Sequence, residues 1–246
     1  MNQIVSLQQL WETAPLSEEN FRWENYTALP EIAQCYLKHA IAPEIPLASA
    51  VHLTMHGEIK LKNWLPFTAE QVIAFPLGFI WKATMKGIPI RGFDQLVQGE
   101  GKMQWKLLGL LPVMEASGED IARSAIGRML GECMWLPSVL CRSDVTWKSL
   151  NASQVIAHLK FQAETIPLTL SVNTEGQLET IQFPRWGNPD EQGYRNIPFG
   201  GMIEAEQTFA GYTIPTRIRG GWFFDGETFQ QDGEFFRATI DQAIFR

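Results

Sequence analysis

Residues 51–61 read VHLTMHGEIKL, and apolar and polar side chains alternate along this run. In an extended chain, Val51 and Leu53 point to one side, whereas His52 and Thr54 point to the other. A period of two is typical of an antiparallel strand that has one buried and one solvated face. The run therefore predicts a half-buried strand.

The same alternation recurs along most of the chain. It is clearest at residues 79–86, 102–107, 155–164, 166–172 and 236–241. We count roughly ten to twelve such runs, and a sheet with that many strands must curl, close or split. The sequence therefore predicts an α+β fold, mostly β, in which a single long curved antiparallel sheet of roughly ten strands forms a half-barrel.

One strong helix, near residues 117–135, interrupts the strands. Ser117 to Asp120 resembles a capping box, and apolar side chains at helical spacing then cover about half of the helix circumference. We expect such a helix to be embedded against the concave face of the sheet. Gly127 and Gly131 predict a close approach by a neighbour, for which packing on the sheet is the simplest reading.

The N-terminal region, residues 1–45, is predicted to form a helical arm packed on the sheet. Its best helix follows Pro30, a residue suited to the first helical position. Neither group of strands has enough helices of its own to cover a separate sheet. We therefore predict a single domain over residues 1–246.

The composition excludes several classes of protein. Of the 246 residues, 45% are hydrophobic and 19% are charged, which excludes intrinsic disorder. The chain carries 20 Lys and Arg against 27 Asp and Glu, and both halves are acidic. We therefore expect neither a nucleic-acid partner nor an anionic-membrane patch.

The expected location is cytoplasmic. No Lys or Arg precedes Arg22, and no continuous apolar segment follows, so the start does not read as an export signal. No apolar run approaches the roughly 20 residues of a membrane span. The three cysteines form no C-x-x-C pair, which fits a reducing compartment.

Strong cofactor and metal signatures are missing from the sequence. The run Gly99–Lys102 is neither a dinucleotide fingerprint nor a P-loop. On a strand, His52 and His56 would lie about 13 Å apart, too far to share one ion. We expect no cofactor and no metal site.

Arg128 and Glu132 are the first candidate site residues. They are spaced i, i+4 at the edge of the apolar arc of the helix, where a charge must be paired or solvated. Two readings are open. The pair is either a structural ion pair, or Arg128 binds an anionic head group while Glu132 orients it.

The second group of candidates lies in the stretch from Arg185 to Tyr194, which reads as a turn-rich loop. Here Arg185, Trp186 and Tyr194 are either ligand contacts or an Arg stacked on Trp as a structural plug. We expect the apolar wall of a binding site to come from inward-facing residues of the sheet and the helix. These residues are Trp81, Trp105, Met129 and Phe161.

Several motifs resemble a family of bacterial proteins known only as a domain of unknown function. They include GEI at residues 57–59, WLPF at 64–67, GFIW at 78–81 and GEGKM at 99–103. More loosely, the order of elements is similar to the LolA/LolB-like lipoprotein carriers. That resemblance implies a curved half-barrel that encloses an apolar cavity; the comparison is one of fold.

Three functions remain open. The first is binding of a lipophilic or amphipathic small molecule in the concave apolar face. The second is an enzyme in the same cavity, with Asp94 or Glu132 as acid or base and Arg128 or Arg185 holding an anion. The third is a purely structural or interaction domain with a solid core. A cavity lined by converging polar groups would separate these readings.

Overall fold

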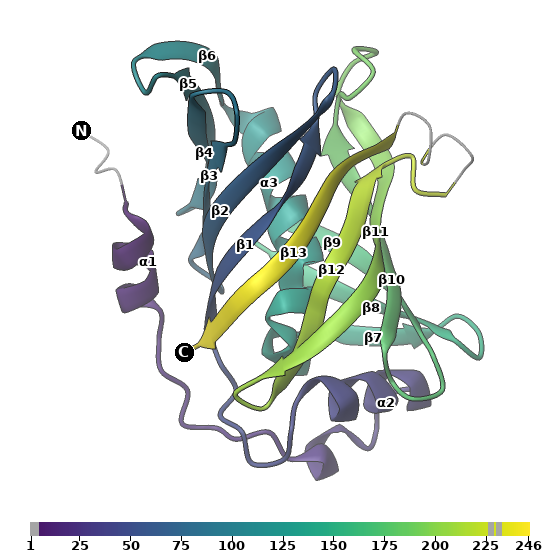
Figure 1. Cartoon of the computed structure of the whole chain (residues 1–246). Helices are drawn as coiled ribbons and strands as arrows, with labels where there is room; N and C mark the ends of the chain where they lie inside the picture. The colour runs from purple at the N-terminus through teal and green to yellow at the C-terminus, as the bar shows by residue number, and fades with distance from the viewer. Residues whose placement is uncertain (1–4, 226–228, 230–232) are drawn as a thin grey trace.

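A computed structural model of the chain describes residues 5–225, 229 and 233–246. The described strands form one antiparallel sheet in the order β6-β5-β4-β3-β2-β1-β13-β12-β11-β10-β9-β8-β7 (Figure 1). The strands are β1 (Ala50–Lys60), β2 (Trp64–Ala74), β3 (Gly78–Met85), β4 (Ile90–Val97), β5 (Glu100–Leu107), β6 (Leu111–Ser117), β7 (Thr146–Ser149), β8 (Gln154–Phe161), β9 (Glu164–Val172), β10 (Leu178–Gly187), β11 (Arg195–Phe209), β12 (Tyr212–Trp222) and β13 (Glu234–Phe245).

The predicted fold class and the curved sheet are confirmed, but the sheet has thirteen strands rather than roughly ten. The difference includes the two edge strands. The side chains of β6 are exposed along nearly the whole strand, and so are most of those of β7. A strand that buries neither face leaves no alternating pattern in the sequence.

The connectivity makes two lobes. The chain winds outward from β1 to β6 at one edge and then crosses the concave face as helix α3 (Glu119–Gly131). It begins again at the opposite edge with β7 and winds back until β13 pairs with β1. Helix α3 contacts β4 and β5 on one side and β8, β9 and β10 on the other, so both lobes wrap around it (Figure 1).

The start of α3 differs from the prediction. Ser117 ends β6, and the N-cap is Gly118, whose φ of 108° suits glycine and which makes no side-chain cap. The expected capping box is therefore wrong. Beyond α3 the chain continues as two 3₁₀ turns, η2 (Glu132–Trp135) and η3 (Pro137–Cys141).

The small residues of α3 do pack on the sheet. A Cβ atom at Gly131 would lie 2.3 Å from Cε1 of Phe183, and one at Gly127 would lie 3.4 Å from Cγ of Arg185. Both neighbours lie on β10. The absence of these two side chains is what lets the helix approach that strand.

The N-terminal helices cover other parts of the sheet. Helix α1 (Leu7–Thr13) packs on the convex face, where Leu10 belongs to one hydrophobic cluster with Val72 and Ile80. Helix α2 (Glu31–Ala40) lies across one end of the sheet, against β12 and β8 (Figure 1). Within the described part of the chain, no helix is long and apolar enough to cross a membrane.

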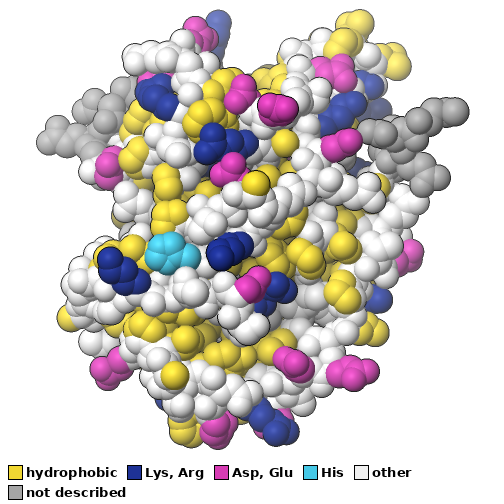
Figure 2. Space-filling view, turned by 180° about the vertical axis from the view of Figure 1, so that it is seen from behind, with side chains coloured by type: hydrophobic (Ala, Val, Ile, Leu, Met, Phe, Trp, Pro, Cys, Tyr) yellow, Lys and Arg dark blue, Asp and Glu magenta, His cyan; other side chains and the backbone are white. Residues whose placement is uncertain are grey.

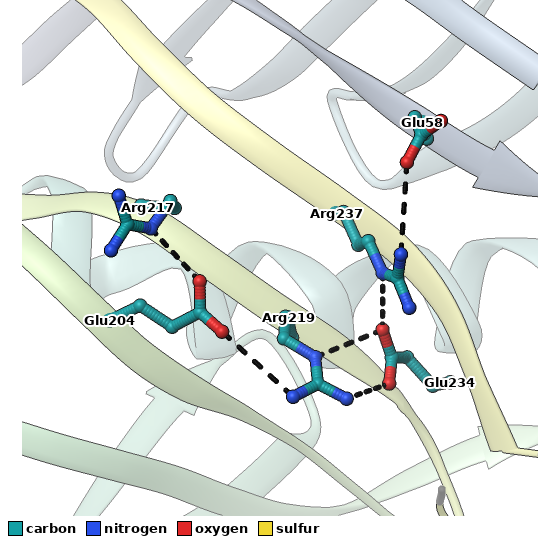
Figure 3. A network of polar contacts seen from close by, with 6 residues as sticks. All are labelled: Glu58, Glu204, Arg217, Arg219, Glu234 and Arg237. Carbon is teal, nitrogen blue, oxygen red and sulfur yellow. Dashed lines mark hydrogen bonds and ion pairs between the residues drawn. The ribbon is translucent and has the colours of Figure 1, made fainter. Parts of the chain in front are cut away.

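A group of charged side chains, which we call the outer network, lies on the convex face of β1, β11, β12 and β13 (Figure 3). Glu234 is its centre: it accepts three hydrogen bonds, two from Arg219 and one from Arg237, and its side chain is 3% exposed. The members are Glu58, Glu204, Arg217, Arg219, Glu234 and Arg237.

Candidate functional site

Three neighbouring strands place a polar row on the concave face. In the sheet register Gln71 on β2 faces Trp81 on β3, and Trp81 faces Asp94 on β4. Residues in direct register share one face of a sheet. Since Trp81 points into the core, Gln71 and Asp94 also point inward, toward α3.

Helix α3 supplies Arg128 to this row, and the first residue of η2 supplies Glu132. The Arg128 Nε–H donates to Glu132 at 2.7 Å, and the Arg128 Nη1–H donates to Asp94 at 3.0 Å. Gln71 donates to the second oxygen of Glu132 at 2.6 Å. The expected pairing of Arg128 with Glu132 is confirmed, and we call these four residues the inner cluster.

Burial controls the charges of the inner cluster. The side chains of Asp94, Arg128 and Glu132 are 18%, 15% and 14% exposed. Burial raises the pKa of Asp94 above its ordinary value, although the Arg128 charge and the Trp105 indole N–H, which donates at 3.2 Å, act in the opposite direction. Burial also acts to lower the pKa of Arg128, but Glu132 and Asp94 together hold that pKa above its usual range.

Two polar atoms at the inner cluster are buried without a hydrogen-bond partner among the described residues. They are Oε1 of Gln71 and Nε1 of Trp81. A buried polar group left unpaired costs about 1–3 kcal/mol, so such groups are uncommon in native structures. An acceptor and a donor therefore stand side by side on β2 and β3, both available to a third group.

Arg185 lies on the opposite wall, on β10. It was expected in a loop, but β10 continues to Gly187, which pairs with Arg195, so Arg185 and Trp186 are strand residues. The Arg185 guanidinium lies 4.6 Å from the ring of Phe199 and 5.0 Å from that of Trp222. These two residues face each other across β11 and β12.

Arg185 forms no ion pair with any carboxylate of the described chain; its Nε–H donates only to the Ser124 carbonyl, at 3.4 Å. Burial, followed by repulsion from Arg128, lowers the pKa of Arg185 to about 9. At pH 7 it is still a cation. Among the described residues, Arg128 thus forms ion pairs with two carboxylates, whereas Arg185 forms no ion pair, although Glu132 and Asp94 act to raise its pKa.

Aromatic rings connect the two arginines across the sheet. Ring centroids lie 5.7 Å apart for Trp81 and Trp105, and 5.6 Å apart for Trp81 and Phe67. The contacts continue through the stacked pair of Phe67 and Phe236, at 5.5 Å. The row then passes along β13 to the rings beside Arg185; its remaining members are Phe235, Phe199 and Trp222.

The row is not uniformly buried. Trp81 is 2% exposed and Trp105 is 8% exposed, whereas Phe236, Phe199 and Trp222 are only partly buried. The inner cluster therefore sits over the closed end of the row, and Arg185 sits over the half-open end.

The structure brings some predicted site residues together and separates others. Trp81, Trp105 and Met129 lie in the core with Arg128 and Glu132. Phe161 belongs to the same hydrophobic core, but it lies at the end of β8, where its ring is 6.1 Å from that of Phe75.

Trp186 and Tyr194 lie apart from the inner cluster as well. Their rings stack at 6.4 Å, the Trp186 indole N–H donates to Asp120 at 2.8 Å, and Arg123 lies 3.9 Å above the Trp186 ring. Trp186 thus packs against the first turns of α3, and Tyr194 stacks on Trp186.

Sequence reasoning missed Gln71, Phe199, Trp222 and the pair at 235–236. For Gln71 a signal was present, since it occupies an inward position of an alternating run between Ala69 and Ile73. A polar residue at such a position must find a partner inside the protein. The partners of Arg185 carried no comparable signal.

His56 and an open groove lie away from the inner cluster. His56 hydrogen-bonds to Asp241 at 2.9 Å, and the described residues contain no group of side chains suited to hold a metal ion. An open groove of about 610 Å³ is lined by Lys82, Arg91 and Lys106 among others, on the convex side of β1 to β5. None of the predicted ligand-binding residues lines it.

Two solved structures are similar to the chain. A putative outer membrane lipoprotein-sorting protein domain from Vibrio parahaemolyticus is 7% identical, with 80% of this chain and 86% of that chain covered and a TM-score of 0.38. A LolA superfamily protein from Nitrosomonas europaea is 10% identical, with 87% and 92% covered and a TM-score of 0.43. The expected similarity to lipoprotein carriers is thus found, but at these scores it assigns no ligand to this chain.

No curated protein gives a significant match to the sequence. A family model does: it matches residues 27–245, from before helix α2 to the last residue of β13. This agrees with the resemblance seen in the sequence motifs. The chain therefore belongs to DUF6920, a family of unknown function.

Proposed function

We propose that the concave face binds an amphipathic small molecule with an anionic head group, and that Arg185 holds this head group. The observation that carries the proposal is the cation of Arg185, which is partly buried among aromatic rings and has no carboxylate partner in the described chain. A charge in such surroundings is costly unless it is paired. A ligand carboxylate or phosphate that accepts bidentate hydrogen bonds from Arg185 would supply the counterion.

The aromatic row supports an apolar body for the same ligand. Phe199, Trp222 and Phe236 are partly buried and follow one another across β11, β12 and β13. An apolar chain lying on these rings would remove the remaining aromatic surface from water, which contributes about 25 cal/mol for each Å². The ligand class is therefore a lipid-like or aromatic acid.

Arg128 has a different part in this proposal. Both of its carboxylate partners are already in place, so it has little capacity left for an anion. It repels Arg185 electrostatically and helps to hold the helix against β4. We assign it to positioning and not to direct contact with the head group.

The test compares two arginine variants. Arg185→Met should weaken binding of a fluorescent fatty-acid probe about tenfold or more, because a buried charge-assisted pair would be lost. Arg217→Met, on the outer face with a 58% exposed side chain, is the matched control and should bind like the wild type. Equal affinity of all three proteins would overturn the proposal, provided that circular dichroism shows them folded.

Mass spectrometry of the organic extract of the purified protein identifies a resident molecule directly. An acidic amphipath that is present in the wild-type extract and reduced in the Arg185→Met extract supports the proposal.

A second function, an enzyme, is favoured by Asp94. Its raised pKa increases the share of the protonated form, which is what a general acid requires, and Trp81, whose indole N–H has no partner among the described residues, faces it across β3 and β4. The two functions predict different fates for the extracted molecule. If the extracted molecule is incubated with the protein and recovered unchanged, the result supports binding. If it is converted to a product and Asp94→Asn abolishes the conversion, the result supports an enzyme.

A further inference from the structure

Three hairpin turns, which join β1 to β2, β3 to β4 and β5 to β6, lie next to one another at one end of the strands. They cover residues 61–66, 86–91 and 106–114, and we call them the basic rim. Backbone hydrogen bonds join them in sequence: Lys86 N–H donates to the Pro66 carbonyl at 2.7 Å, and Leu108 N–H donates to the Pro89 carbonyl at 2.6 Å. The rim is thus one continuous surface made from three separate stretches of chain.

The rim concentrates exposed apolar side chains. It holds seven of the thirteen exposed large hydrophobic residues found among the described residues, and Leu110 reaches 80% exposure. In Figure 2 hydrophobic side chains gather on the protruding upper right corner, the side on which β5 and β6 lie in that view. The seven are Leu61, Ile88, Leu108, Leu110, Leu111, Val113 and Met114. Contiguous exposed apolar surface of this kind marks an interaction site.

The charge of the rim is opposite to that of the whole chain. The rim contains four of the 20 Lys and Arg and none of the 27 Asp and Glu, in a chain of net charge −7. The four are Lys62, Lys86, Arg91 and Lys106, and none of them forms an ion pair with a carboxylate of the described residues. The rim therefore combines exposed apolar side chains with cations that have no carboxylate partner among the described residues. Its binding partner should have an apolar interior and an anionic surface.

Arg91 shows how closely the two kinds of side chain are interleaved. A Cβ atom at Gly109 would lie 2.1 Å from the Arg91 Nη2 atom, so the guanidinium rests against the turn that carries Leu108 and Leu110. Gly109 has a φ of 72°, which glycine adopts freely. Because Gly109 has no side chain, the Arg91 guanidinium can lie against the turn that carries Leu108 and Leu110.

We propose that the basic rim is a docking surface for an anionic lipid bilayer. The leucines of the 106–114 turn enter the boundary between head groups and acyl chains, and the four cations lie against the anionic head groups. This inference does not rest on the proposed function, because it uses other residues on another part of the sheet.

The rim does adjoin the half-open end of the aromatic row. Leu65 in the rim faces Ile59 on β1, and Ile59 faces Phe236 on β13. Only strand β1 therefore separates the rim from Phe236, a ring that we assign to the ligand site.

The experiment measures flotation of the full chain with vesicles of phosphatidylcholine, with and without added phosphatidylserine. The wild type should float with the anionic vesicles, and salt should reduce its binding. Lys86→Glu together with Lys106→Glu should weaken binding by at least about fivefold for each lysine, and Leu110→Ser with Leu111→Ser should weaken it similarly.

The controls make the same types of substitution, one residue at a time, on other surfaces. Lys148→Glu lies on exposed β7, and Leu16→Ser replaces a leucine that is 71% exposed; both should bind like the wild type. Absence of flotation, or equal flotation of rim variants and controls, would overturn the proposal. So would a lipid-independent dimer, detected by sedimentation, that the leucine changes dissociate, because the rim would then bind a second copy. None of these outcomes depends on Arg185, so the two proposals can fail separately.

Discussion

The inner cluster and the outer network place carboxylates beside arginines, yet the pKa shifts of their central carboxyl groups have opposite directions. Burial raises the pKa of Asp94 in spite of Arg128. Hydrogen bonds from Arg219, and then from Arg237, lower the pKa of Glu234 below its ordinary value, against the effect of burial. The Glu234 side chain is 3% exposed and that of Asp94 is 18% exposed, so solvent access alone does not explain the difference.

What matters is which groups cover the carboxylate. Glu234 is covered by its own two arginines, which donate three hydrogen bonds and are themselves 31% and 42% exposed to water. Asp94 accepts one bond from Arg128 and one from Trp105, and lies among the aromatic rings of the concave face. An ion pair surrounded by apolar groups keeps a desolvation penalty that one at the sheet surface largely escapes.

The largest effect is expected for the central cation of the inner cluster. Arg128→Leu removes the cation that is hydrogen-bonded to both Asp94 and Glu132, and should lower the free energy of unfolding by about 3–5 kcal/mol. Urea denaturation at pH 7 measures this change. Arg217→Leu in the outer network is the control and should cost less than about 1 kcal/mol. Equal costs would show that burial does not distinguish the two regions.

Removal of one inner carboxylate should cost less. In Glu132→Ala, Arg128 keeps its ion pair with Asp94, but the side-chain N–H of Gln71 loses its acceptor. We expect a loss of about 2–3 kcal/mol, in the range for hydrogen bonds to charged groups. The same urea titration tests it. A loss as large as that of Arg128→Leu would mean that Asp94 contributes nothing to holding the cation.

The centre of the outer network should show a smaller, pH-dependent effect. The folded state holds the pKa of Glu234 below its unfolded value, so its stabilisation is present above the ordinary carboxyl range and is lost as pH falls through the lowered pKa. Glu234→Gln should therefore cost about 1–2 kcal/mol at pH 7. Unfolding measured in parallel for both proteins should show this difference shrink under acid conditions. A difference that grows in acid would contradict the sign.

Asp94 should give the smallest change, with the opposite slope. Its pKa is higher in the folded state than in the unfolded state, so its contribution to stability falls as pH rises from the ordinary aspartate range through the raised value. Asp94→Asn removes this slope and retains an oxygen acceptor for Trp105. At neutral pH the variant should lie within about 1 kcal/mol of the wild type. A wild-type advantage that increases with pH would be the contrary result.

Local patterns predicted much of the architecture. The alternation of residues 51–61 and the helical spacing after Ser117 indicate which side of each element is buried, and this depends only on near neighbours in the chain. For the same reason the i, i+4 spacing predicted the contact between Arg128 and Glu132. The exposed edge strands escaped prediction because neither of their faces is buried.

Contacts between distant stretches depend on the order of strands, which no local pattern encodes. Gln71 reaches Glu132, and Arg185 reaches Phe199 and Trp222, because a helix crosses the sheet and three strands lie side by side.

The net charge of the sequence likewise did not predict where charged side chains gather. Both halves of the sequence are acidic, but the meander sets three turns next to one another and gathers their cations and leucines on one surface. Periodicity in the sequence thus determines which side chains are buried, because burial follows from the geometry of a single strand or helix. The tertiary structure determines which of them meet, because charges and hydrogen-bond donors act across space and not along the chain.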